Sequence, residues 1–156
     1  MSEDLVTLIA RVKAQGDFSL IAEKIPYLRF LGIDADTSAG HVVCRMRFAP
    51  HLVGNRTIPA LHGGTIGALL ESAAVFQILW EAETVALPKT INLTVDYLHS
   101  ARAVDTYARG IVTKHGRRVV NVRAEAWQED PERPVAVATA HFLVLPPGPS
   151  EASGQD

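Results

Sequence analysis

The most apolar stretch of the sequence lies near its middle, from Gly63 to Glu83. Its first half, residues 65–76, contains a single charged residue, Glu71. Pro59 precedes the stretch and Pro88 follows it, so no proline interrupts a helix there. A helix that is apolar almost all round is buried within a protein rather than lying on its surface. The pattern therefore predicts a long, buried central helix over residues 63–83.

The second half of the sequence alternates between apolar and polar positions, which is the period of a strand with one covered face. Ile91 and Leu93, for example, alternate with polar residues. The pair His115-Gly116 and the proline-containing segment 129–134 supply turns between such stretches. We expect strands over residues 91–98, 107–113, 119–128 and 135–145.

Helical spacing also marks the start of the chain. Apolar residues predict a helix over 5–12, with Ser2 as its N-cap and Gly16 as its C-terminal stop. Closer to the central helix, two prolines, a glycine and an asparagine fall within 49–61 and favour a loop. The remaining expected elements are a short helical piece over 18–24 and a hairpin or bent strand over 33–48 that breaks near 38–40.

This order of elements predicts an α+β fold in which an antiparallel sheet curls around one helix. A length of 156 residues supports one domain. We place that domain over residues 1–146, with an N-terminal helical extension over 1–26. The tail over 147–156 is rich in Pro, Gly, Ser and acidic residues, so we expect it to be disordered.

Composition and charge argue against several classes of function. The net charge of −2, with fifteen Lys and Arg spread along the chain, gives no basic surface for nucleic acid. No apolar run reaches the ~18 residues of a membrane span, and the acidic start of the chain lacks the basic residues of a signal peptide. We therefore expect a cytoplasmic protein with no nucleic-acid or membrane partner.

The single cysteine and the scattered histidines do not indicate thiol or metal chemistry. Cys44 lies in an apolar strand pattern, where a buried, inert thiol is the favoured interpretation. The alternative, a catalytic cysteine, needs an activating histidine or a helix N-terminus beside it. The histidines other than His62 stand singly rather than at ligand spacing, so we expect no metal.

Glu71 is the residue most informative about function. One turn away on a helix lie Gly67, Ala68, Ala74 and Val75, which are all small or apolar. A surface glutamate would have polar neighbours there, and a carboxylate in apolar surroundings is destabilising unless it is paired or hydrogen-bonded. We therefore favour a functional carboxylate over a structural one.

The segment His62-Gly63-Gly64 precedes this helix and places glycine amides at its positive end. Such amides have no partner inside the helix, so they can donate to a developing oxyanion. Glycine also allows a substrate to approach the backbone closely. A plain glycine loop is the alternative interpretation, but two glycines followed about two turns later by a buried acid favour an active site.

The run Leu-His-Gly-Gly at 61–64, followed after six residues by Glu71, resembles the signature of hotdog-fold thioesterases of the PaaI-like, 4-hydroxybenzoyl-CoA thioesterase superfamily. The segment 88–98 is similar to the strand that follows the helix in that family, and the resemblance covers about residues 30–145. It implies a hotdog fold and hydrolysis of an acyl-CoA or acyl-carrier-protein thioester. It implies no cofactor, since CoA is part of the substrate.

The resemblance also assigns roles by position. Glu71 would act as the nucleophile or as the general base for water, and the Gly63 amide would polarise the thioester carbonyl. His62 would support that carbonyl-binding corner, with Gly64 beside it at the substrate. Thr90 matches the place of a Ser or Thr that orients water or the acid.

One position departs from the family pattern. The family often has Asn or Gln six residues before the motif histidine, where this chain has Arg56. Asn55 lies one residue earlier, and a one-residue bulge, helped by Pro59, would bring it into place. On that condition we include Asn55 among the expected catalytic residues.

Basic residues at strand ends are candidates for binding the phosphates of CoA. Lys114, Arg117 and Arg118 flank the turn at His115-Gly116, and Arg102 follows another strand end. Charged residues of a solvated turn are the alternative interpretation of the same four side chains.

Two other functions stay open on this fold. A hydroxyacyl-thioester dehydratase pairs a histidine with an acid, and His51 suggests that pattern. It lies twenty residues before Glu71, however, which is farther than such enzymes use. A non-catalytic acyl-CoA-binding protein is the second alternative, although loss of activity would most simply remove the acid. Thioester hydrolysis is therefore the favoured function.

A curled sheet of five or six strands leaves open edges, which proteins usually pair or cover. A two-fold partner is the commonest cover, so we expect a homodimer. The family resemblance implies further that Glu71 of one subunit and the Gly63 amide of its neighbour form one site. A dimer of dimers is the expected larger assembly.

Overall fold

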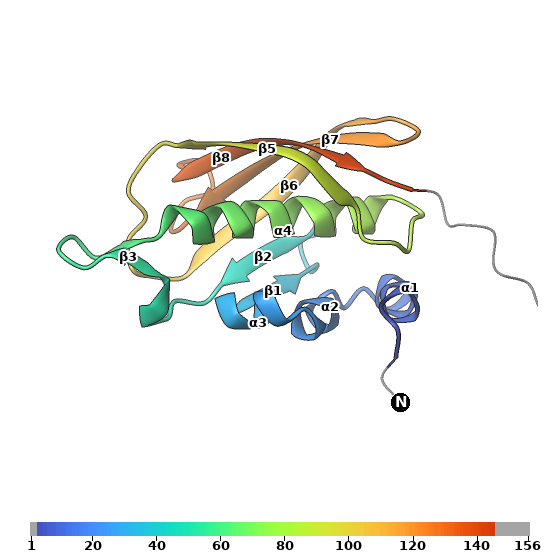
Figure 1. Cartoon of the computed structure of the whole chain (residues 1–156), viewed down its shortest axis with the longest axis horizontal. Helices are drawn as coiled ribbons and strands as arrows, with labels where there is room; N and C mark the ends of the chain where they lie inside the picture. The colour runs from blue at the N-terminus through green and yellow to red at the C-terminus, as the bar shows by residue number, and fades with distance from the viewer. Residues whose placement is uncertain (1–2, 146–156) are drawn as a thin grey trace, which may run out of the picture.

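A six-stranded antiparallel sheet curves over one long helix, α4 (Gly63–Glu81), in the computed structural model (Figure 1). The structure describes residues 3–145, so the expected cap Ser2 and the tail 147–156 lie outside the described residues. The strand order across the sheet is β1-β2-β6-β7-β8-β5, and every neighbouring pair is antiparallel. The strands are β1 (Ile33–Asp36), β2 (Val43–Met46), β5 (Lys89–Tyr97), β6 (Thr106–His115), β7 (Val119–Trp127) and β8 (Ala136–Leu143). The predicted α+β fold is confirmed.

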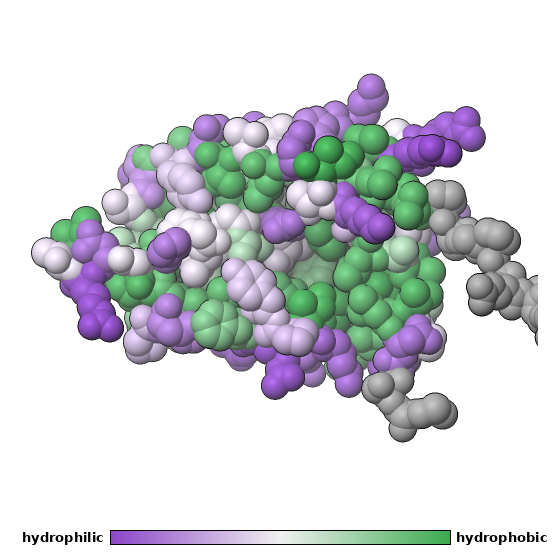
Figure 2. All heavy atoms as spheres, viewed as in Figure 1, coloured by the Kyte–Doolittle hydropathy of each residue, from purple (hydrophilic) through white to green (hydrophobic). Residues whose placement is uncertain are grey.

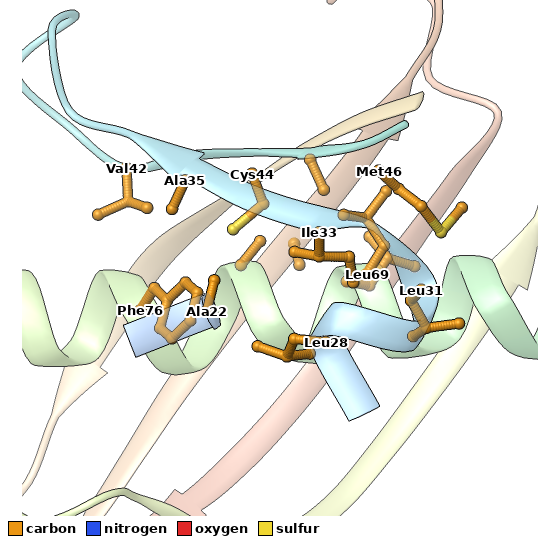
Figure 3. Close-up of a cluster of buried hydrophobic side chains, with 14 of the residues drawn as sticks. Ala22, Leu28, Leu31, Ile33, Ala35, Val42, Cys44, Met46, Leu69 and Phe76 are labelled. Atoms are coloured by element: carbon orange, nitrogen blue, oxygen red, sulfur yellow. The ribbon is translucent and has the colours of Figure 1, made fainter. Parts of the chain in front are cut away.

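The central helix is buried, as its apolar composition predicts. Leu69 and Phe76 of α4 are fully buried, and Figure 3 shows them among side chains from β1, β2 and α3. By length and composition alone α4 is apolar enough to cross a membrane, which corrects the expectation that no segment reaches that length. Its place in the core accounts for this composition, since a helix covered by a sheet and by other helices needs apolar residues on most of its faces.

The sheet approaches α4 most closely at Gly110 of β6. A Cβ atom on Gly110 would lie 2.9 Å from the Ala73 carbonyl oxygen and 3.0 Å from the Ala74 Cα atom. The facing positions of α4 are alanines, so the backbone of β6 at Gly110 packs directly on the backbone of α4. Glycine at this position therefore sets the depth at which the helix lies in the sheet.

Three helices precede the first strand: α1 (Leu5–Gln15), α2 (Ser19–Lys24) and α3 (Pro26–Leu31). The N-terminal helical extension therefore reaches Leu31 rather than the expected residue 26. Gly16 ends α1 in the left-handed conformation with φ of 74°, as the sequence predicts. The N-cap is Asp4 rather than Ser2, because its carboxylate accepts the Thr7 amide at 2.8 Å. That hydrogen bond lowers the pKa of Asp4.

The helix α3 is missing from the sequence-based prediction, because a proline inside a helical pattern normally ends the helix. Here Pro26 is the first helical residue, where the missing N–H would have no partner in any case. The helix ends at Gly32, which has φ of 69°. One proline thus separates α2 from α3 and turns the chain between them.

The segment 49–61 is more regular than the expected loop. It contains a short 3₁₀ helix, η1 (Pro50–Leu52), and a small hairpin of β3 (Val53–Asn55) and β4 (Ala60–Leu61). A Cβ atom on Gly54 would lie 2.8 Å from the His62 Cα atom, so the hairpin packs directly against the start of α4. Tertiary packing of this kind is invisible to local turn signals.

Cys44 is fully buried in β2, and burial raises the pKa of its thiol far above the usual range. A thiolate is the reactive form of cysteine, and this side chain does not reach it at physiological pH. The structural interpretation of Cys44 therefore holds.

Replacing Gly110 with alanine is expected to destabilise the fold. The added methyl group would overlap the α4 backbone, and overpacking of this kind costs about 1–3 kcal/mol. The free energy of unfolding from urea denaturation measures the effect. Gly67→Ala is the matched control, because the nearest atom to its new Cβ is 3.7 Å away and alanine favours a helix. Equal stability of the two variants would contradict the close approach at Gly110.

Candidate active site

The carboxylate of Glu71 is held at the surface of α4 by a residue from the next strand. Thr90, at the start of β5, donates its hydroxyl to Glu71 Oε1 at 2.5 Å. Glu71 is half-buried, and the neighbouring Ser72 hydroxyl is directed back to the Ala68 carbonyl at 2.7 Å. Thr90 thus orients one carboxylate oxygen, and Oε2 has no hydrogen-bond donor within residues 3–145.

Glu71 and Thr90 border a cavity of about 220 Å³. Most of the other lining side chains are apolar, and Glu71 is the one charged residue among the described residues that line it. The cavity lies between α4, the loop before β5 and the junction of α2 with α3. Its main apolar lining residues are Ile25, Tyr27, Leu28, Val75, Phe76 and Leu87. An acid beside an apolar cavity is an arrangement suited to a substrate with an apolar group next to a reacting carbonyl.

The backbone groups of the first two glycines of α4 differ in their hydrogen-bond partners. His62 caps the helix, and its Nδ1 atom accepts the Gly64 amide at 2.9 Å. Tyr97 donates its hydroxyl to the Gly63 carbonyl at 2.7 Å. Within residues 3–145 the Gly63 amide itself meets no acceptor. The carbonyl of Gly63 and the amide of Gly64, which form the peptide group between the two glycines, therefore both have hydrogen-bond partners. The amide of Gly63 stays available to a ligand.

Tyr97 belongs to this corner although sequence reasoning did not assign it a role. A Cβ atom on Gly63 would lie 3.2 Å from its Cε1 atom, so a side chain at this position would require the ring to shift by a few tenths of an ångström. The ring and Gly63 line a second cavity of about 330 Å³ at the helix N-terminus. The local pattern shows Tyr97 only as the end of an alternating strand, and 34 residues separate it from Gly63.

Glu71 and the Gly63 amide do not meet within one chain. They lie eight residues apart on the same helix, which corresponds to about 12 Å at a rise of 1.5 Å per residue. A carbonyl group is much smaller than that separation. One thioester cannot contact both groups of the same α4 helix.

Asn55 lies in β3 and hydrogen-bonds within its own turn. Its Oδ1 atom accepts the Thr57 amide at 3.0 Å and the Ile58 amide at 3.4 Å. The register of β3 against β4 shifts between Val53 and Asn55, before the segment that joins Asn55 to His62. These contacts use the oxygen, and the Nδ2 donor has no acceptor among the described residues.

The structure brings together three of the four expected phosphate-binding residues. Lys114, Arg117 and Arg118 line a cavity of about 550 Å³ at the turn between β6 and β7. Arg102 does not line this cavity and forms an exposed ion pair with Glu129 instead. Within residues 3–145, no three His, Cys, Asp or Glu side chains are grouped to hold a metal ion.

His51 does not pair with Glu71 in this chain. It lies in η1, where its Nε2 atom is 2.8 Å from the Phe30 carbonyl oxygen and its ring packs on the Phe30 ring at 4.7 Å. A dehydratase of the type considered above needs a histidine beside the acid. The contacts of His51 connect η1 to α3 instead.

A curled antiparallel sheet around a buried helix, with an acid in the middle of that helix and glycine amides at its start, defines a hotdog-fold protein of the thioesterase class. Residues 59–135 match the family model described as Thioesterase superfamily. The chain is also 30% identical over 134 residues to the medium/long-chain acyl-CoA thioesterase YigI of Salmonella typhimurium, covering 77% of this chain and 86% of that protein. The chain belongs to the thioesterase superfamily, and the protein is a hydrolase acting on thioester bonds.

Solved structures show the same fold. The crystal structure of a Chromobacterium violaceum protein is 36% identical and superposes with a TM-score of 0.70, covering 88% of this chain and 96% of that one. A phenylacetic acid degradation-related protein from Ralstonia eutropha is 27% identical with a TM-score of 0.67, covering 81% of this chain and 98% of that one. The likeness therefore includes most of the N-terminal half as well as the segment matched by the family model.

We expect Tyr97→Phe to lower kcat about fivefold, which corresponds to the loss of one hydrogen bond of about 1 kcal/mol. The ring stays in place against Gly63, but the carbonyl of Gly63 loses its donor and the first turn of α4 is held less firmly. Steady-state kinetics on the best thioester measures kcat and KM separately. Tyr107→Phe, on a tyrosine stacked against Trp127, is the control. An unchanged kcat in Tyr97→Phe would show that the turn is held without this hydroxyl.

Proposed function

We propose that the protein hydrolyses acyl-CoA thioesters, with Glu71 as the catalytic carboxylate. The observation that supports this most directly is the Glu71 carboxylate, held by Thr90 at the border of an apolar cavity. The relatives named medium/long-chain acyl-CoA thioesterase support CoA as the group that carries the acyl chain. The apolar lining of the cavity matches the acyl part of such a substrate.

Two chemical routes use this carboxylate. In the first, Glu71 takes a proton from water, the water oxygen attacks the thioester carbon, and the carbon–sulfur bond breaks to release a carboxylic acid and the thiol of CoA. In the second, a Glu71 oxygen attacks that carbon and expels the thiol, and water then cleaves the resulting anhydride. Both routes need donors for the negative charge on the carbonyl oxygen, and both consume one water.

The Gly63 amide supplies the main donor in this proposal. It lies at the positive end of α4 and points away from intrahelical bonds, which favours a developing negative charge. His62 holds the Gly64 amide and so fixes the first turn. Asn55 contributes its Nδ2 donor, which has no acceptor within residues 3–145, as a second contact to the carbonyl oxygen.

The site is shared between two subunits. Glu71 and Gly63 of one helix are about 12 Å apart, so a thioester that contacts both groups takes them from different chains. The edge strand β5 offers the surface for a partner, because it pairs with β8 on one side and with no strand of residues 3–145 on the other. Ile91 and Tyr97 of β5 are each 54% exposed. Figure 2 shows apolar residues over much of the face on which α4 and β5 lie.

The phosphates of CoA are assigned to the basic turn between β6 and β7. Lys114, Arg117 and Arg118 line one cavity there and carry three positive charges. A guanidinium group binds phosphate oxygens through two parallel hydrogen bonds, which suits this role. Arg102 is a weaker candidate, because Glu129 already neutralises it.

Glu71→Gln is expected to lower kcat at least about 10³-fold while the protein stays folded. The amide has nearly the same shape as the carboxylate but is neither a base nor a nucleophile. Thiol release from acyl-CoA measures turnover, and circular dichroism measures folding. Glu81→Gln, an exposed acid at the end of the same helix, should keep its activity. If Glu71→Gln retains wild-type kcat, another residue carries the chemistry.

Gly63→Pro removes the proposed donor without removing the helix, because proline is favoured as the first helical residue. The preceding His62 has φ of −63° and ψ of 129°, which a following proline allows. We expect kcat to fall about 10²- to 10³-fold, as for a lost oxyanion donor. Gly63→Ala is the matched control, since it adds a similar Cβ beside Tyr97 but keeps the amide.

Mixing the two inactive variants then tests the shared site. A heterodimer of Glu71→Gln and Gly63→Pro subunits contains one site with an intact acid and an intact amide, so refolding the mixture should restore part of the activity. Neither variant alone should do so at the same concentration. A fully active wild-type monomer in sedimentation analysis would contradict the shared site.

A further inference from the structure

The cavity beside Glu71 has one wall that comes from the helices before the sheet. Ile25, Tyr27 and Leu28, at the junction of α2 and α3, line the cavity on one side. The facing side comes from Val75 and Phe76 of α4. The wall from the N-terminal extension lies outside residues 59–135, the segment matched by the family model.

We propose that this junction forms the acyl-chain pocket and limits the length of chain that the enzyme accepts. The inference rests on the proposed function, because it takes the acyl group of the thioester hydrolysed at Glu71 as the occupant. Among the described residues that line the cavity, Glu71 is the one that carries a charge. A saturated, uncharged chain fits such a lining, whereas a second carboxylate at the end of the chain would be buried without a partner.

The size of the cavity sets the chain length. A cavity of roughly 150 Å³ holds a six-carbon ring such as benzene. The observed volume of about 220 Å³ therefore accommodates roughly eight carbons on the same scale. A longer chain would have to displace a wall or leave the cavity.

Two wall residues control different ends of this space. Leu28 is 6% exposed and belongs to the same buried cluster as Phe76, and both residues line the cavity (Figure 3). We therefore assign these two residues to the inner end of the pocket. Tyr27 is 56% exposed and lines the cavity at the same time. In this proposal its ring covers the outer end of the cavity and provides apolar contact for the chain.

Specificity constants for straight-chain acyl-CoAs of four to sixteen carbons test the pocket. In the wild type, kcat/KM should rise about fourfold for each added methylene until the cavity is full, at roughly eight carbons, and then level off or fall. Tyr27→Ala should reduce the preference for octanoyl-CoA over butyryl-CoA about tenfold or more, because the outer wall is lost. Leu28→Ala should move the optimum two to three carbons longer, because it deepens the inner end by about three carbon atoms.

Phe30→Ala is the matched control for both variants. Phe30 lies on the same short helix and is 60% exposed, but it does not line the cavity. Its profile of chain-length preference should match that of the wild type. If Leu28→Ala does not fold, Tyr27→Ala still decides the outcome, because its exposed ring contributes little to the core. A folded Tyr27→Ala with the wild-type profile would overturn the proposal.

A binding measurement separates this proposal from the proposed function. Octyl-CoA thioether, which cannot be hydrolysed, and CoA alone are titrated calorimetrically into wild type, Tyr27→Ala and Phe30→Ala. Weaker binding of the thioether to Tyr27→Ala, with equal binding of CoA, supports the pocket even if no thioester is hydrolysed, in which case the proposed function fails alone. Equal binding of the thioether to all three proteins overturns the pocket and leaves hydrolysis standing.

Discussion

The close contact between α4 and β6 at Gly110 is the constraint on which the rest of the structure depends. The backbone of the helix lies against the backbone of the strand there, so the helix sits deep in the curve of the sheet. Every group assigned to the candidate active site is placed relative to this helix. A shallower helix would move Glu71 away from Thr90 and the Gly63 turn away from Tyr97. One contact between small residues thus fixes both the core and the site.

Both ends of α4 are held by side chains from outside the helix. At its start, His62 and Tyr97 satisfy the first peptide groups. At its end, the Lys13 ammonium donates to the carbonyls of Ala82 and Thr84. A cation near the C-terminus of a helix stabilises the helix dipole, and partial burial lowers the pKa of Lys13. The contact ties α1 to the central helix, so the N-terminal extension is packed against the same element that carries the site.

The position of the site at an open edge of the sheet has a physical consequence. Thr90 and Tyr97 stand near opposite ends of β5, and each contacts α4 at one of the two proposed reaction groups. The same strand leaves one edge without a partner among the described residues. A chain that joins this edge would therefore bring its own α4 close to both ends of the site. The unpaired edge of β5 therefore lies beside both groups of the proposed shared site.

The sequence by itself determined the main elements, because periodicity is local. The buried helix and the alternating strands follow from the spacing of their own apolar residues, and a family signature of eleven positions picked out Gly63 and Glu71. Tertiary structure decided what local signals cannot carry. Pro26 starts a helix instead of ending one, the 49–61 segment forms a hairpin against His62, and Tyr97 reaches Gly63 across 34 residues. The apolar cavity likewise exists only where the α2–α3 junction meets α4, since a cavity is formed by surfaces distant in sequence and shaped by their packing.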